Sequence, residues 1–223
     1  MNRKEIVVIR VITTENEEFL NVHGKLIETY YPMLHTTSYC IPDQPKGIHS
    51  LESKAAAIPK IVELAKRHQD ADAIVISCCD DPAVSLIRST LPVPVIGAGE
   101  SVCSLARNFG SQIGVIGITD YAPEVYKTYL QGHLINLGRP SLVSNTLDLM
   151  MDDGHRSVLD LAVSLKAKGA DCIALSCTGM STTGISREIE ELCKIPVIDP
   201  VMAEGLFAYY ACVRKTIYRR IKC

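Results

Sequence analysis

The chain has 223 residues, of which 47% are apolar, and its formal net charge at pH 7 is −2. This length allows one large domain or two domains of about 100 residues, with a substantial hydrophobic core. The near-neutral charge gives no general attraction to nucleic acid or anionic membranes, and the absence of tryptophan leaves few side chains for base stacking. We therefore expect a small-molecule partner, and neither a nucleic-acid nor a membrane partner.

The nine cysteines favour a reducing compartment. Their number is odd, and no Cys-x-x-Cys motif occurs. The segment 1–5 leads directly into a strand-like run and lacks the features of a signal peptide. No apolar run approaches the roughly 18 to 20 residues that cross a bilayer. The sequence predicts a cytoplasmic protein with free thiols.

Strand-like apolar runs and helical periodicity alternate along the whole chain. In the first half we expect strands at 5–12, at 33–41, up to Cys78 and at 91–97, and helices at 16–30, 51–68, 82–90 and 101–109. In the second half we expect strands at 112–118, 141–146, 171–177 and 195–199, and helices at 121–132, 154–168, 182–193 and 200–214. Asn16, Asp81-Pro82 and Asp199-Pro200 are typical of helix starts.

One stretch of the chain occurs twice. The run from Ala71 to Cys78 ends in Ser-Cys, and so does the run from Ala170 to Cys177. The two runs keep one register, because 170 minus 71 and 177 minus 78 both equal 99. Each reads as a buried parallel strand that delivers a cysteine to the loop before the next helix. The chain is therefore expected to consist of two similar halves.

Alternating strands and helices predict an α/β fold with two pseudo-symmetric Rossmann-like lobes and parallel sheets. We expect 1–97 plus 200–223 to form the first lobe and 98–199 to form the second. Ligands of such folds bind beyond the carboxyl ends of the strands. The predicted active site therefore lies in the cleft between the lobes, with Cys78 and Cys177 approaching a ligand from opposite sides.

Two thiols on opposite faces of a ligand suit racemisation or epimerisation. One group removes a proton from carbon while the other returns a proton to the opposite face. A thiolate can serve as the base and a thiol as the acid. This scheme needs no metal or cofactor, and the scattered histidines lack metal-ligand spacing.

The segments Cys78-Cys79-Asp80-Asp81-Pro82 and 175–180 (Leu-Ser-Cys-Thr-Gly-Met) resemble the two cysteine motifs of the aspartate/glutamate/hydantoin racemase superfamily, most closely its hydantoin racemase branch. The resemblance covers nearly the whole chain. It implies a two-lobed α/β fold, cofactor-independent racemisation and assembly into homo-oligomers. It also implies that Cys78 and Cys177 are the catalytic pair. By the same resemblance Thr178 and Gly179 hold the substrate's carbonyl or carboxylate, and Thr119 lines the cleft.

The first motif departs from the hydantoin racemase pattern, Cys-Phe-Gly-Asp-Pro. Cys79 replaces the aromatic residue and Asp80 replaces the glycine, so we expect both to change the substrate-binding wall. Two acids beside the site would oppose a dicarboxylate, unless Asp81 caps its helix. A 5-substituted hydantoin or related neutral cyclic amide is therefore the expected substrate.

Other interpretations of these residues stay open. Thr13, Thr14 and Thr119 are substrate contacts or simply cap and loop hydroxyls. Cysteines elsewhere suit a hydrophobic core. Gly97-Ala98-Gly99 is a weak sign of a dinucleotide turn. The functional alternatives are an amino-acid racemase of the Asp/Glu type and a small-molecule binding protein that has lost turnover.

Overall fold

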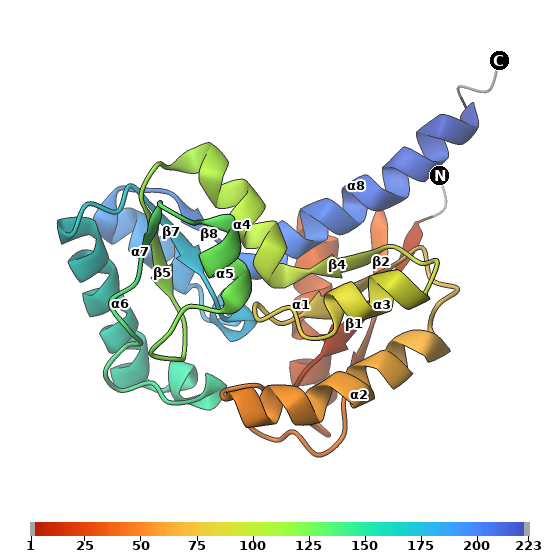
Figure 1. Ribbon diagram of the computed structural model, residues 1–223, viewed down its shortest axis with the longest axis horizontal. Helices are drawn as coiled ribbons and strands as arrows, with labels where there is room; N and C mark the ends of the chain where they lie inside the picture. Colours follow the sequence, from red (N-terminus) through yellow and green to blue (C-terminus); the bar gives the residue numbers. More distant parts are fainter. Residues whose placement is uncertain (1–2, 221–223) are drawn as a thin grey trace.

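The structure is a computed structural model that describes the backbone of residues 3–220 and side chains as far as Arg214. Two lobes lie side by side, each with a four-stranded parallel sheet (Figure 1). The first sheet has the strand order β2-β1-β3-β4 and the second has β6-β5-β7-β8. The same order recurs with every strand number raised by four, which confirms the two-lobed parallel α/β fold and the two similar halves.

The elements alternate as the sequence predicts. The first half contains β1 (Lys4–Arg10), α1 (Glu17–Tyr30), β2 (Leu34–Cys40), α2 (Leu51–Arg67), β3 (Ala73–Ser77), α3 (Val84–Thr90), β4 (Val95–Gly97) and α4 (Ala98–Phe109). The second half contains β5 (Ile113–Ile116), α5 (Glu124–Tyr129), β6 (Leu134–Ile135), the 3₁₀ helix η1 (Thr146–Met150), α6 (Asp152–Ala167), β7 (Cys172–Leu175), the 3₁₀ helix η2 (Thr178–Thr182), α7 (Ile185–Cys193), β8 (Val197–Ile198) and α8 (Pro200–Arg220).

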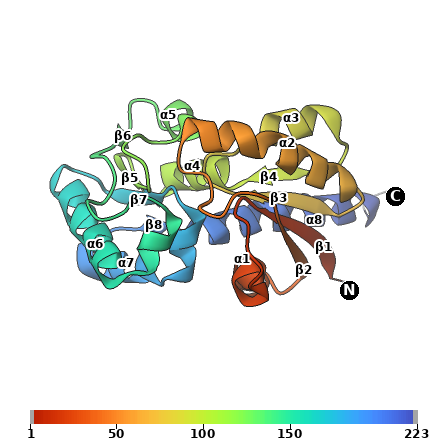
Figure 2. The same cartoon turned by 90° about the horizontal axis from the view of Figure 1, so that it is seen from below.

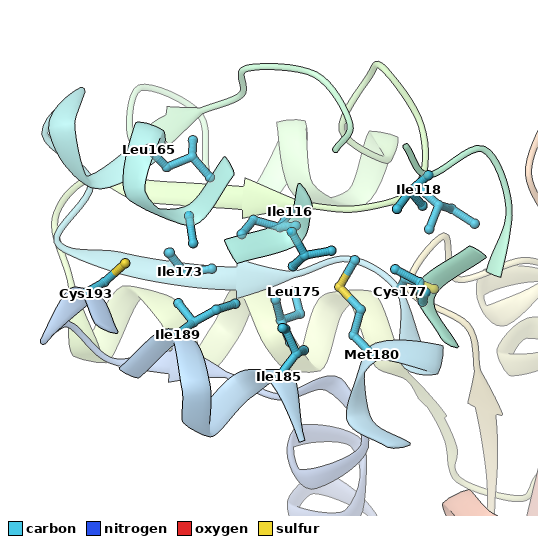
Figure 3. Packing of buried hydrophobic residues seen from close by; sticks show 14 of the residues in the cluster. Ile116, Ile118, Leu165, Ile173, Leu175, Cys177, Met180, Ile185, Ile189 and Cys193 are labelled. Carbon is cyan, nitrogen blue, oxygen red and sulfur yellow. The ribbon is translucent and has the colours of Figure 1, made fainter. Parts of the chain in front are cut away.

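Both faces of each sheet are covered by helices, as expected for strands that are apolar on both parities. In the first lobe, α2 and α3 cover one face, and α1 and α8 cover the other (Figure 2). In the second lobe, α6 and α7 pack against Ile116, Ile173 and Leu175 on one face (Figure 3). The helices α4 and α5 cover the opposite face.

Two helices pack on the sheet of the other half of the chain. α4 follows β4 of the first sheet but packs on the second, whereas α8 follows β8 of the second sheet but packs on the first. α4 and α8 also contact each other. We retain the lobe boundaries at 97/98 and 199/200 as a proposal.

One expected strand is wrong, and several expected helices have other bounds, among them the helix after Cys78. The expected strand at 141–146 is wrong: the edge strand is β6, which pairs with β5, while η1 begins at Thr146. The turn-forming residues Ser144 and Asn145 instead bond to Asp148 at the start of η1. The expected helix at 82–90 begins only at Val84, after Ala83 in a left-handed conformation with φ of 64° and without a side-chain cap.

Gly99 is required by close packing between α4 and the loop after β3. A Cβ atom at this position would lie 2.2 Å from the carbonyl oxygen of Cys79. We expect Gly99→Ala to lower the free energy of unfolding by about 1–3 kcal/mol, because backbone atoms must shift to admit the methyl group. Urea denaturation provides the measurement. Asn108→Ala, at an exposed position of the same helix, serves as the control and should change stability by less than about 0.5 kcal/mol. Equal stability of both variants would contradict the packing argument.

Candidate active site

A cavity of about 70 Å³ lies at the carboxyl ends of the central strands of both sheets. Its wall comes from four segments at strand ends, namely 10–12, 77–80, 118–123 and 176–179. Residues 47–50 and Thr146 complete it. Parallel strands bring their carboxyl ends to one edge of a sheet, and here two such edges contribute to one cavity.

The structure brings the two predicted catalytic thiols to this cavity. Cys78 directly follows β3, and Cys177 stands two residues beyond β7. Their exposed fractions are only 9% and 8%. Figure 3 shows Cys177 at the end of the second lobe's core, far from Cys193 at the opposite end. Burial raises the pKa of both thiols because it removes water from around the thiolate.

The surroundings of the two thiols differ in charge. Around Cys78, the N–H of Asp80 lowers the thiol pKa, whereas the negative charges of Asp80, Asp81 and Cys177 raise it, so that with burial it lies well above the usual value. Around Cys177, burial raises the pKa and the largest opposing contributions lower it. These contributions come from the N–H groups of Gly179 and Met180, the Thr146 hydroxyl and the charge of Arg10.

The residue that follows each thiol contacts the opposite lobe. Cys79 donates a weak hydrogen bond from Sγ to the carbonyl oxygen of Leu175 at 3.8 Å, and Thr178 donates from Oγ1 to the carbonyl oxygen of Ser77 at 3.2 Å. Positions 79 and 178 are 99 apart and therefore equivalent in the repeat. These reciprocal bonds join the ends of β3 and β7.

Cys79 belongs chiefly to the second lobe's core, although it borders the cavity. Its exposed fraction is 2%, and burial raises its pKa well above the usual value. Tyr126, which is fully buried, donates to the same Leu175 carbonyl at 2.7 Å. The sulfur atom of Cys79 therefore contacts the lobe interface, and its predicted role as a substrate contact stays a prediction.

Asp80, Thr119 and Gly179 also line the cavity. The Asp80 carboxylate pairs with Lys54 of α2, with Nζ and Oδ1 2.9 Å apart. The Thr119 hydroxyl donates to the carbonyl oxygen of Tyr121 at 2.7 Å. A Cβ atom on Gly179 would approach within 2.5 Å of Thr146 Cγ2, so a larger residue at this position would require Thr146 to shift.

The structure does not bring Thr13 and Thr14 to the cavity. The Thr13 hydroxyl donates to the carbonyl oxygen of Ile41 and accepts from the N–H of Gln44, at 2.6 and 2.7 Å. The Thr14 hydroxyl accepts from the N–H of Asn16. Both hydroxyls therefore stabilise loops after β1, while Arg10, Val11 and Ile12 reach the cavity wall instead.

Asp81 does not cap the helix that follows it. It adopts a left-handed conformation with φ of 45°, and its two carboxylate oxygens accept from the N–H groups of Gly99 and Glu100 at 2.8 and 2.7 Å. The carboxylate thus occupies the N-terminus of α4, where a nucleotide phosphate would bind in a dinucleotide turn. A Cβ on Gly97 would lie 2.5 Å from Asp81, so the glycines at this turn accommodate protein atoms.

Sequence reasoning missed several polar residues of the site. Arg10 lines the cavity. A charged residue within the apolar run 6–12 is unusual, and this could have identified Arg10 from the sequence. Ser77 bonds to His23 of α1 and Glu204 of α8 in a buried polar cluster. His23 and Glu204 are far apart in sequence and carried no motif. Thr146 lies in a segment for which a strand was expected.

The comparisons with known proteins agree with the two-lobed structure. The family model described as Asp/Glu/Hydantoin racemase matches residues 25–204. The chain belongs to this racemase family. This membership places it among the isomerases and confirms the resemblance inferred from the two cysteine motifs.

Two curated relatives are named hydantoin racemase. The one from Paenarthrobacter aurescens is 29% identical over 64% of this chain and 62% of its own length. The one from Rhizobium meliloti is 26% identical over 84% of each chain. Among solved structures, an allantoin racemase from Klebsiella pneumoniae superposes with a TM-score of 0.80 at 22% identity, over 95% of this chain and 89% of that one. The similarity to the allantoin racemase structure confirms the two-lobed fold of this chain.

Neither a membrane-spanning helix nor a cluster of metal-binding side chains occurs among the described residues. In the part of the chain that the structure describes, no helix has the length and apolar character of a membrane span. Across the same described residues, no three His, Cys, Asp or Glu side chains are grouped to hold a metal ion.

Ionisation of Asp81 should make the stability of the protein depend on pH. Burial raises its pKa from about 4 to about 7, although the two N–H donors lower it. The folded state therefore favours the protonated carboxyl, and this contribution to stability is complete below about pH 4 and lost as the pH rises to about 7. Relative to Asp81→Asn, the free energy of unfolding of the natural chain should fall by at most about 1.4 kcal/mol per pH unit across this window. Urea denaturation at several pH values measures the difference; parallel curves for the two proteins would refute this assignment.

Proposed function

We propose that this protein is a cofactor-independent racemase in which Cys78 and Cys177 exchange the α-proton of a 5-substituted hydantoin or related cyclic amide. The observation that carries the proposal is that two thiols from equivalent positions of the two halves line one small cavity. Their approach from different lobes suits proton transfer on opposite faces of a carbon atom.

The reaction requires one thiolate and one thiol. The thiolate removes the proton from C5 of the ring, and the electron pair of the C–H bond passes to the neighbouring carbonyl to give an enolate. The thiol then protonates C5 on the opposite face and becomes the thiolate. The product is the opposite enantiomer. With the protonation states of the two cysteines exchanged, the same steps run in the reverse direction.

The cavity also offers groups that stabilise a developing enolate. The N–H groups around Thr178 and Gly179 lie at the end of β7, beside Cys177. The Thr178 hydroxyl already donates to Ser77 and the N–H of Gly179 faces Cys177, so the backbone N–H of Thr178 is the better candidate to hold the substrate's carbonyl oxygen. Burial of the cavity strengthens such bonds, because little water competes for them.

Support for a cyclic amide comes from the named relatives. The curated relatives bear the name hydantoin racemase. The charge argument against a dicarboxylate is weaker than the sequence suggested, because Lys54 pairs with Asp80 and α4 binds Asp81.

Three broader properties of the protein are proposed from the sequence alone. A small-molecule substrate, assembly into homo-oligomers and a cytoplasmic location remain expectations from the sequence.

Exchange of the α-proton tests the two-thiol mechanism. In deuterium oxide, the natural protein should racemise L- and D-hydantoins and remove the C5 proton signal from both. Cys78→Ser and Cys177→Ser should each reduce racemisation by about 10²–10⁴-fold or more, because each leaves one face without its proton carrier. Each variant should still exchange the proton of one enantiomer, and the two variants should differ in which one. Proton NMR with polarimetry measures both quantities, on a panel that includes allantoin and free aspartate and glutamate.

Cys193→Ser is the matched control, since this buried cysteine does not line the cavity. It should keep full racemisation. Equal residual racemisation in both cavity variants would exclude the two-thiol scheme. Turnover of aspartate or glutamate alone would establish the amino-acid racemase, and ligand binding without any exchange would establish the binding protein.

A further inference from the structure

His49 lies in the cavity wall, on the loop before α2. The loop 44–50 is held at several points. The buried side chain of Gln44 donates from Nε2 to the carbonyl oxygens of Gly47 and Ser53 at 3.2 and 3.0 Å. The N–H groups of His49 and Ser50 donate to the Ser53 hydroxyl at 3.1 and 2.9 Å. The position of His49 is therefore fixed before any ligand binds.

The hydrogen bond of the His49 ring decides which of its two nitrogens can meet a ligand. Nδ1 lies 3.1 Å from the carbonyl oxygen of Gly47. A carbonyl oxygen only accepts, so in the neutral ring Nδ1 carries the proton and Nε2 is an acceptor. Within the described part of the chain, no group is hydrogen-bonded to Nε2. His49 therefore brings an unused acceptor to the cavity wall.

Several other polar side chains of the wall already bond to the protein. The hydroxyl groups of Thr119, Ser176 and Thr178 each donate to a backbone carbonyl oxygen. Asp80 pairs with Lys54 through Oδ1, which leaves Oδ2 as a second acceptor on the first lobe. Of these two acceptors, the imidazole nitrogen belongs to the side chain that no ion pair engages.

The loop that carries His49 lies close to the surroundings of Cys177. A Cβ atom on Gly47 would lie 3.6 Å from the hydroxyl oxygen of Thr146, and this oxygen is 4.0 Å from Cys177 Sγ. His49 thus lines the cavity from the first lobe, and the N–H of Thr178 belongs to the second lobe. A ligand between the lobes can meet an acceptor from one and a donor from the other. A cyclic amide carries both N–H groups and carbonyl oxygens, so it can satisfy both.

We propose that His49 is a substrate-binding residue whose Nε2 accepts a hydrogen bond from a ring N–H of the cyclic amide. This role rests on the proposed class of substrate. While the N–H of Thr178 holds a carbonyl oxygen, the bond to His49 holds a second edge of the ring, and the two bonds together restrict its orientation between Cys78 and Cys177. His49 then selects rings with a free N–H over analogues of the same shape that lack it.

Isothermal titration calorimetry with matched ring compounds tests this role, at about pH 8, where an imidazole is neutral. 5-Methylhydantoin carries both ring N–H groups. In 2-methylsuccinimide a CH₂ group replaces N1–H, and in 3,5-dimethylhydantoin a methyl group replaces the N3 proton. The natural protein should bind 5-methylhydantoin about tenfold or more tightly than one of these analogues, because that analogue leaves Nε2 unpaired. His49→Phe should weaken binding of 5-methylhydantoin by about tenfold and change the affinity for that analogue little, so that the affinity ratio falls toward one.

Two further variants separate the lost hydrogen bond from other effects. His49→Gln places an amide oxygen near the position of Nε2 and should keep most of the affinity for 5-methylhydantoin. His133→Phe is the matched control, because the Nδ1 atom of His133 also lies near a carbonyl oxygen, that of Ser111 at 2.9 Å, but away from the cavity wall. It should leave all the affinities unchanged. Circular dichroism establishes that each variant is folded, and His49→Ala replaces His49→Phe in the comparison if the latter does not fold.

Three results would overturn the proposal. These are affinity ratios in folded His49→Phe equal to those of the natural protein, a natural protein that binds all the compounds equally, and a natural protein that does not bind 5-methylhydantoin. Loss of the ratio in Asp80→Asn, but not in His49→Phe, would assign the acceptor to Asp80 and also overturn it.

Exchange of the C5 proton judges the proposed function separately. Selective binding that depends on His49, without exchange on any substrate, would refute racemisation and leave the role of His49 intact. Exchange on a hydantoin, with unchanged affinity ratios in His49→Phe, would refute the role of His49 and leave racemisation intact.

Discussion

A thiolate buried between two protein lobes is stable only if nearby donors and charges replace the water it has lost. Cys78 and Cys177 have exposed fractions below one tenth, so this requirement applies to both. Burial raises the pKa of both thiols, and the neighbouring groups differ. N–H groups, a hydroxyl and a cation lower the pKa of Cys177, whereas Cys78 has one N–H that lowers its pKa and two acids that raise it. A pair in which one member is ionised and the other protonated is the state that proton transfer between faces requires.

This inequality arises in the loops, because the strands that carry the thiols are alike. After β7 the chain turns at once into η2, which directs its first N–H groups toward Cys177. After β3 the chain passes through two left-handed residues, Asp81 and Ala83, before α3 begins. That detour carries the Asp81 carboxylate to the start of α4. One loop therefore supplies donors to its thiol, and the other uses its acid to hold the second lobe.

The sequence was sufficient to predict the fold and the placement of Cys78 and Cys177 at equivalent strand ends, because both depend on repeated local patterns. Strand-length apolar runs predicted both sheets, and the 99-residue repeat placed Cys78 and Cys177 at equivalent strand ends. The roles of hydroxyl and carboxylate groups were harder to predict from the sequence, since they depend on which backbone groups lie nearest in space. Thr13 bonds to residues about 30 positions away, and Asp81 to a helix 18 positions away. The Arg10 environment involves Glu204 at the other end of the chain, which no local pattern reveals.

The placement of the two thiols depends on contacts between the lobes, since a different sheet carries each one. The reciprocal bonds of Cys79 and Thr178 are the contacts nearest to the thiols, because each donor directly follows one of them. The acceptor carbonyls belong to the strand ends that carry the other thiol. A relative movement of the lobes would therefore stretch both bonds together with the separation of the two sulfur atoms. A thiol at position 79 satisfies this requirement in little space, which gives Cys79 a structural reason to differ from the aromatic residue of the hydantoin racemase pattern. Asp80 lines the cavity beside Cys79, and its carboxylate pairs with Lys54.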